Sequence, residues 1–193
     1  MELIDTHTHL YSQEFKEDVQ KVMQKADNAG IKQFYMPAID SSTHDAMLAI
    51  EAAYPDRCHS MMGLHPCSVK ENFQEELTII PKWLDKRDFV AIGEIGLDFY
   101  WDKTHIEHQY EAFKIQMEWA LERAIPIVIH ARESLDECIA TVQPFAARGL
   151  KGIFHCFGGT TEQAKAIIGL NFYLGIGGVF TFKKANMPEV LKD

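Results

Sequence analysis

The 193-residue sequence contains no run of about 18 or more apolar residues, so no segment of it is predicted to span a membrane. The amino-terminus, Met-Glu-Leu-Ile-Asp, also lacks the basic start and the long apolar stretch of a secretory signal peptide. From these two absences we expect an intracellular, cytoplasmic protein that does not act at a membrane.

Positive charge is scarce, and the formal net charge is −9. Broad electrostatic binding to nucleic acid needs a basic surface, so this composition argues against that mode of binding. A phosphate-containing substrate remains compatible with the charge, because bound metal ions can supply positive charge locally.

The sequence has no C-x-x-C pair, and its four cysteines are expected to be reduced thiols in an intracellular chain. Two of them, Cys67 and Cys156, closely follow the candidate site residues His65 and His155. We interpret both cysteines as small packed residues beside the site.

Seven short apolar runs alternate with longer amphipathic stretches. The runs are almost continuously apolar, which is typical of parallel strands that are covered on both faces. The expected strands are residues 3–6, 33–36, 60–64, 90–95, 126–129, 152–154 and 172–176. The expected helices are residues 14–29, 43–53, 75–86, 107–123, 135–147 and 162–168.

This alternation predicts an α/β fold with a parallel sheet, either an open doubly wound sheet or a (β/α)8 TIM barrel. No G-x-G-x-x-G follows the first strand, which weakens the dinucleotide-binding form of the open sheet. Metal-ligand residue types recur at strand ends, where barrel active sites lie. We expect residues 1–193 to form one barrel domain. Because such barrels take about 250 residues, we expect it to be truncated after the seventh βα unit, without the closing strand and helix.

An H-x-H pattern follows the first expected strand, where Asp5, His7 and His9 alternate along the chain. Residues two apart in a strand point to the same side, so the two imidazoles, about 6–7 Å apart, can converge on one cation. An H-x-H by itself is a modest signal, and two histidines in a polar turn are the alternative.

Ligand-type residues also end three later strands. Glu94 ends an apolar run between glycines, and an unpaired carboxylate would be costly to bury there. A metal, or two metals bridged by its oxygens, removes that cost. His130 and His155 end the next two strands, and neutral imidazole is the form in which histidine binds metals. Each histidine alone would more often be packed or solvated, but their recurrence favours a metal site.

Four other residues are candidates for contact with substrate. His65 ends the third expected strand, and we favour contact with a substrate oxygen over metal binding or a structural role. Arg132 follows His130 and could clamp an anionic oxygen. Lys183 and Lys184 follow the seventh strand and could meet phosphate, although a lysine pair is usually a solvated surface.

The order of these segments resembles that of TatD-type metal-dependent deoxyribonucleases, which belong to the amidohydrolase-like superfamily. The resemblance runs over the whole chain. The Gly-Glu-Ile-Gly-Leu-Asp and His-Cys-Phe-Gly-Gly segments are specific, whereas H-x-H is shared with the wider superfamily. The matching segments are Asp5-Thr6-His7-Thr8-His9-Leu10, Gly63-Leu64-His65-Pro66, Gly93-Glu94-Ile95-Gly96-Leu97-Asp98, His130-Ala131-Arg132 and His155-Cys156-Phe157-Gly158-Gly159.

The resemblance implies a (β/α)8 barrel with two divalent metal ions, zinc, magnesium or manganese, that hydrolyses phosphodiester bonds in DNA, with exonuclease-like activity in several members. Glu94 matches the catalytic carboxylate between the metals. A further aspartate after the family's eighth strand has no counterpart here. The expected metal ligands are His7, His9, Glu94, His130 and His155, and the expected substrate contacts are His65, Asp98 and Arg132.

Other functions remain open. Cyclic-amide hydrolases and organophosphate-type esterases share H-x-H, but many use a carboxylated lysine on the fourth strand, where this chain has Glu94 and no lysine. A phosphoesterase of the polymerase-and-histidinol-phosphatase type also begins with H-x-H, but the segment around Glu94 argues against it. A non-catalytic, truncated relative is the alternative from outside the enzymes, and the missing end supports it.

Overall fold

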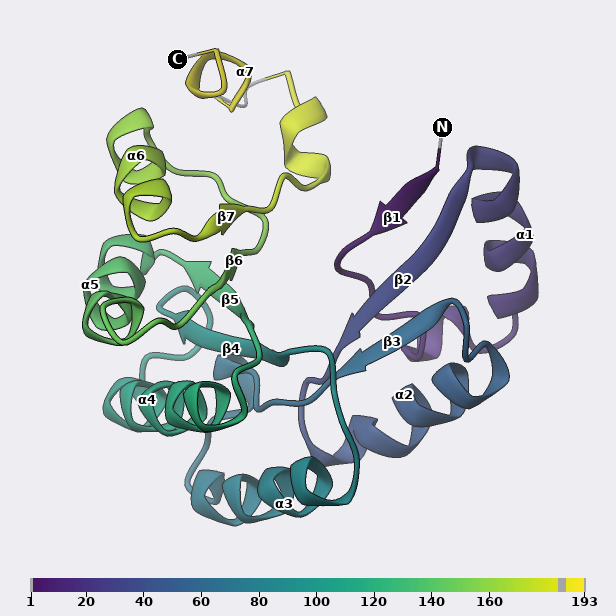
Figure 1. Ribbon diagram of the computed structural model, residues 1–193, viewed down its shortest axis with the longest axis horizontal. Coiled ribbons are helices and arrows are strands. Elements are labelled where there is room, and N and C mark those ends of the chain that lie inside the picture. Colours follow the sequence, from purple (N-terminus) through teal and green to yellow (C-terminus); the bar gives the residue numbers. More distant parts are fainter. Residues whose placement is uncertain (1, 184–186, 193) are drawn as a thin grey trace.

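The computed structural model describes residues 2–183 and 187–192, and it shows an α/β fold built on parallel strands (Figure 1). Seven strands occur in the described residues, and each pairs in parallel with its sheet neighbours. They form two sheets, ordered β1-β2-β3 and β4-β5-β6-β7. The strands are β1 (Leu3–Asp5), β2 (Ile31–Pro37), β3 (Cys58–Met61), β4 (Ile92–Asp98), β5 (Ile127–Arg132), β6 (Gly152–Phe154) and β7 (Tyr173–Leu174).

Helices follow the strands, and α1 to α6 lie on the outer side of the curved sheets (Figure 1). No described helix is both long and apolar enough to cross a bilayer. The α-helices are α1 (Val19–Ala29), α2 (Ser41–Ala53), α3 (Phe73–Lys86), α4 (Ile106–Arg123), α5 (Leu135–Ala146), α6 (Thr161–Gly169) and α7 (Met187–Val190). The short 3₁₀ helices are η1 (Gln13–Phe15), η2 (Pro66–Ser68) and η3 (Gly178–Thr181).

The two sheets are joined where β2 and β3 approach β4. Met62 and Ile92 form an isolated parallel bridge. The Ala38 N–H donates to the Gly93 carbonyl over 3.1 Å, and the Glu94 N–H donates to the Ala38 carbonyl over 3.2 Å. The seven strands therefore follow one another around a common interior, as in a (β/α) barrel.

The apolar core lies between the strands and the outer helices. Helix α4 illustrates how the sequence builds it, because Phe113, Met117 and Ala120 recur at helical spacing and are fully buried against β4 and β5. Inside the barrel, Met61, Ala91 and Val128 form a small separate cluster. A largely apolar cavity of about 690 Å³ adjoins this cluster, and none of the expected site residues lines it.

Two strands extend further than the apolar pattern predicts. The expected strands ended at Ile95 and Ile129, but β4 and β5 continue to Asp98 and Arg132, so Glu94 and His130 lie within them. The continuation depends on Gly96, where a Cβ would lie 2.0 Å from the His130 carbonyl oxygen. His65 also differs from expectation, because β3 ends at Met61 and His65 caps η2.

Candidate metal centre

A single buried carboxylate, that of Glu94, lies at the centre of the expected site. One of its oxygens, Oε2, faces the H-x-H pair, with the Nε2 atom of His7 at 3.1 Å and that of His9 at 3.7 Å. The other oxygen, Oε1, lies 3.1 Å from Nδ1 of His130 and 3.6 Å from Nε2 of His155. The two oxygens therefore face different pairs of imidazoles.

The imidazoles also contact one another. The rings of His7 and His155 are stacked, with centroids 3.5 Å apart and an interplanar angle of 14°. His65 lies on the Oε1 side, with its Nε2 atom 3.8 Å from that oxygen and 3.2 Å from Nδ1 of His130. All five predicted histidines thus converge on Glu94.

Tyr11 determines which nitrogen of His9 faces the cluster. The Tyr11 hydroxyl donates to the carbonyl of Pro37, so it accepts from Nδ1–H of His9 over 2.8 Å. The Nε2 atom of a neutral His9 then carries a free lone pair on the side of Glu94. Burial lowers the pKa of His9 and favours this neutral form. Tyr11 was not singled out from the sequence, although it lies two residues beyond the H-x-H pair.

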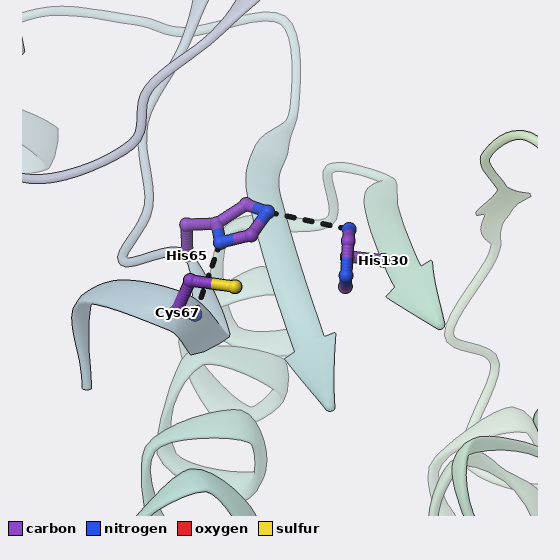
Figure 2. Close-up of side chains that lie close together, drawn as sticks. All are labelled: His65, Cys67 and His130. Carbon is purple, nitrogen blue, oxygen red and sulfur yellow. Dashed lines mark hydrogen bonds between the residues drawn. The ribbon is translucent and has the colours of Figure 1, made fainter. Parts of the chain in front are cut away.

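His65 has the opposite tautomer. Its Nδ1 atom accepts the backbone N–H of Cys67 over 3.0 Å, so a neutral His65 carries its proton on Nε2 (Figure 2). Burial lowers the pKa of His65 to about 4, which keeps the ring neutral near pH 7. His65 therefore presents an N–H donor to the centre, as contact with a substrate oxygen requires.

His130 lies between two carboxylates. Its Nε2 atom is 2.8 Å from Oδ2 of Asp98, and its Nδ1 atom faces Glu94. Burial alone would lower the pKa of His130, but the hydrogen bonds and charges of Glu94 and Asp98 outweigh it and raise the pKa. Asp98 is itself fully buried, and its other oxygen accepts the backbone N–H groups of Tyr100 and Trp101. Both Asp98 oxygens are thus engaged within the protein.

The protonation states fit the binding of cations. Burial would raise the pKa of Glu94, but hydrogen bonds with His130 and His7 hold it well below its ordinary value, so the carboxylate is ionised. Burial lowers the pKa of His155 to about 4. An anionic carboxylate beside the neutral rings of His9 and His155 is a donor set typical of divalent transition metals.

Two groups of side chains are spaced closely enough to hold an ion. In the first, His7, His9 and Glu94 offer ligand atoms within 4.8 Å of one another. In the second, His65, Cys67 and His130 do the same (Figure 2). The first group fits a cation better, because the neutral His65 of the second group presents a proton rather than a lone pair. Burial and the nearby Asp98 carboxylate also raise the pKa of the Cys67 thiol to about 12, so the thiol is protonated.

Helix α4 holds the backbone beside two of the site residues. Gln109 accepts the Asp98 N–H over 2.8 Å and donates to the Asp98 carbonyl over 3.2 Å. Gln116 binds Leu64, next to His65, in the same way, at 2.7 and 3.2 Å. These buried amides satisfy backbone groups that the strands leave unpaired. Neither glutamine was singled out from the sequence.

The predicted cationic residues lie at the edge of the cluster or outside it. Arg132 is exposed at the end of β5, and its guanidinium packs on the rings of Tyr100 and Trp101. Arg132 and His155 line a common pocket of about 450 Å³. Lys183 is exposed, and Lys184 lies outside the described residues.

Comparisons with known proteins place this chain in a family. The model of the family described as TatD related DNase matches residues 4–193. An uncharacterized metal-dependent hydrolase, YabD of Bacillus subtilis (strain 168), is 33% identical over 192 residues, covering 99% of this chain and 75% of the relative. The 3'-5' ssDNA/RNA exonuclease TatD of Erwinia tasmaniensis is 28% identical over 176 residues, covering 91% of this chain and 68% of the relative. The crystal structure of YJJV, a TatD homologue from Escherichia coli K12, superimposes with a TM-score of 0.90 at 26% identity, covering 98% of this chain and 73% of that structure.

Proposed function

The chain belongs to the TatD-related DNase family, and we propose that its histidine and carboxylate cluster hydrolyses phosphodiester bonds in DNA from a strand end. One observation carries the proposal. The buried, ionised Glu94 directs each of its oxygens to a separate pair of imidazoles, as a carboxylate shared by two cations would. The name of the Erwinia tasmaniensis relative supports nucleic acid as the substrate class.

In this proposal the two sides of Glu94 hold separate divalent ions. His7 and His9 would hold an ion on the Oε2 side, and His130 and His155 would hold an ion on the Oε1 side. Histidine and carboxylate ligands suit zinc or manganese, and magnesium suits the site when substrate oxygens complete its shell. When bound, such ions lower the pKa of water and stabilise negative charge on the phosphate.

The chain's own residues then hold the reacting groups in place. The Nε2–H of His65 donates a hydrogen bond to a non-bridging phosphate oxygen, because its Nδ1 atom is already bonded to the backbone. Arg132 neutralises charge on the strand at the edge of the centre. Asp98 accepts from Nε2–H of His130, so once the ring has lost its second proton the Nδ1 lone pair would face the Glu94 side, where a cation would be held.

The test is metal-dependent cleavage of end-labelled DNA. Protein freed of metal with EDTA is incubated with single- or double-stranded DNA, and Mg²⁺, Mn²⁺ or Zn²⁺ is then added in turn. We expect stepwise shortening from one end only when metal is present. Glu94→Gln should remove this activity, because an amide cannot bridge two cations as a carboxylate does, whereas Glu111→Gln, on the exposed face of α4, should retain it. Absence of product with every metal, or full activity of Glu94→Gln, would contradict the proposal.

A further inference from the structure

Two exposed aromatic side chains lie directly beyond the buried end of β4. Tyr100 is 47% exposed and Trp101 is 67% exposed, although both follow the fully buried Asp98 by only two or three residues. Their rings meet edge to face, with centroids 4.9 Å apart at 85°. Leaving this much aromatic surface in water forgoes the free energy that its burial would release. The pair is therefore placed as a contact surface for a flat partner.

An arginine completes this surface. The guanidinium carbon of Arg132 lies 3.9 Å from the ring centroid of Tyr100 and 5.1 Å from that of Trp101. Strand pairing sets the contact, because Asp98 and Arg132 are register partners between β4 and β5. Among the described residues no carboxylate forms an ion pair with Arg132, so its N–H donors remain available to a phosphate.

The same carboxylate links these aromatic residues to the metal centre. Oδ1 of Asp98 accepts the backbone N–H groups of Tyr100 and Trp101, each over 3.0 Å, while Oδ2 is bonded to His130. The start of the aromatic segment is thus held at a fixed distance from the imidazole that lies beside Glu94. A single carboxylate therefore connects the backbone of this segment with His130.

Charge alone does not account for nucleic acid binding at this edge. The net charge of the chain is −9. Lys103, two residues beyond Trp101, lies 3.9 Å from the Glu133 carboxylate, and Lys70 is paired with Asp102 at 2.6 Å. Stacking of a base on an aromatic ring contributes about five- to 150-fold in affinity and needs no net positive charge. It does need an unpaired base, because bases in a duplex already stack on each other.

We propose that Tyr100, Trp101 and Arg132 form a stacking platform for an unpaired nucleobase of the strand being cut. The aromatic rings receive the base, and the guanidinium contacts the adjacent phosphate. This inference rests on the proposed phosphodiester hydrolysis, and it adds the residues that recognise the base.

The first test measures binding by the metal-loaded protein. A short fluorescein-labelled oligothymidylate with phosphorothioate linkages, which slow cleavage, serves as the probe. We expect Trp101→Ala to weaken its binding about tenfold or more, and Trp101→Phe to retain most of the affinity. Tyr173→Ala is the matched control, because Tyr173 is 76% exposed but lines the apolar cavity away from the metal centre. Binding should also quench tryptophan fluorescence in the wild type and less so in Trp101→Ala.

The second test separates the platform from the chemistry. Cleavage of oligothymidylate is compared with cleavage of an abasic strand of the same length, which offers phosphodiesters without bases. The expected result is a raised KM for oligothymidylate in Trp101→Ala, with a KM for the abasic strand close to that of the wild type. If the wild type cleaves neither strand, the hydrolytic proposal fails, and the binding measurement alone decides the platform. Equal binding and equal KM of Trp101→Ala and wild type for oligothymidylate would overturn the platform and leave the hydrolytic proposal intact.

Discussion

Replacing Asp98 by asparagine tests how the protein orients His130. The three donors around Asp98 determine which way the new amide lies. The amide oxygen must continue to accept hydrogen bonds from the N–H groups of Tyr100 and Trp101, since the reverse orientation would place the NH₂ group against two donors. The amide NH₂ then points at Nε2 of His130, where Oδ2 lay 2.8 Å away. Nε2 must become an acceptor, so the proton of the neutral ring moves to Nδ1.

This exchange of tautomers removes a ligand atom. Nδ1 is the nitrogen that faces Glu94, and a protonated nitrogen cannot bind a cation. Changes to the carboxylate partner of a metal-binding histidine typically cost about 10- to 100-fold in metal affinity. The expected loss for Asp98→Asn is therefore about 1.4–2.8 kcal/mol of binding free energy.

Competition with a chromophoric chelator measures the effect, with the metal-free protein titrated with Zn²⁺ or Mn²⁺. Asp102→Asn is the control, because that carboxylate is four residues along the chain and pairs with Lys70 instead of a site histidine. A metal affinity of Asp98→Asn within about twofold of the wild type would refute the reasoning. If Asp98 contacts substrate instead, the loss will appear in KM with unchanged metal affinity.

Two further predictions concern stability. Gln116→Leu leaves the buried N–H and carbonyl of Leu64 without partners, so urea unfolding should show that the unfolding free energy is lower by about 2–6 kcal/mol. Gln143→Leu, on the exposed face of α5, is the control and should leave the unfolding free energy nearly unchanged. Similar losses in both variants would contradict the prediction. Burial lowers the pKa of His65 and His155 to about 4, below the unfolded value near 6.5. Between these pH values the unfolded chain binds more protons than the folded chain. The unfolding free energy of the metal-free protein should therefore decrease as the pH is lowered from about 6.5 to about 4. This decrease should reach about 3 kcal/mol per histidine. Urea unfolding midpoints measured in EDTA across this pH range should depend less on pH in His155→Gln than in the wild type. Midpoints that rise as the pH is lowered toward 4 would contradict the prediction.

The convergence of the site residues was predictable because it depends on topology and residue type. Parallel strands present their carboxyl ends at one edge, so His7, Glu94, His130 and His155 had to approach one another once the strands were recognised. Their roles as ligands remain a prediction, although the distances to Glu94 support it.

The ends of β4 and β5 were not predicted correctly from the apolar pattern. The apolar runs stop before Glu94 and His130, yet β4 and β5 continue through both residues. A polar side chain inside a strand is tolerated here because it points into a cluster that satisfies it, and the satisfying atoms come from other strands. Hydrophobic periodicity along one segment contains no information about such partners.

Contacts that depend on register were not predictable at all. Arg132 was expected to meet an anionic oxygen, but its packing on Tyr100 follows from the pairing of β4 with β5, over thirty positions apart in the chain. Cys67 was interpreted as a packed residue, and its thiol lies beside His65 only because η2 turns the chain back on itself.

The two buried glutamines of α4 impose a constraint on chain length. Gln109 and Gln116 are seven residues apart, so they lie on one face of the helix, about 10.5 Å from each other. Gln109 is hydrogen-bonded to the backbone of Asp98 and Gln116 to that of Leu64, so the helix sets the separation between these two segments of the site. A single residue inserted between them would rotate one amide by about 100° off the buried face. We therefore expect length changes between Gln109 and Gln116 to be excluded in any working variant.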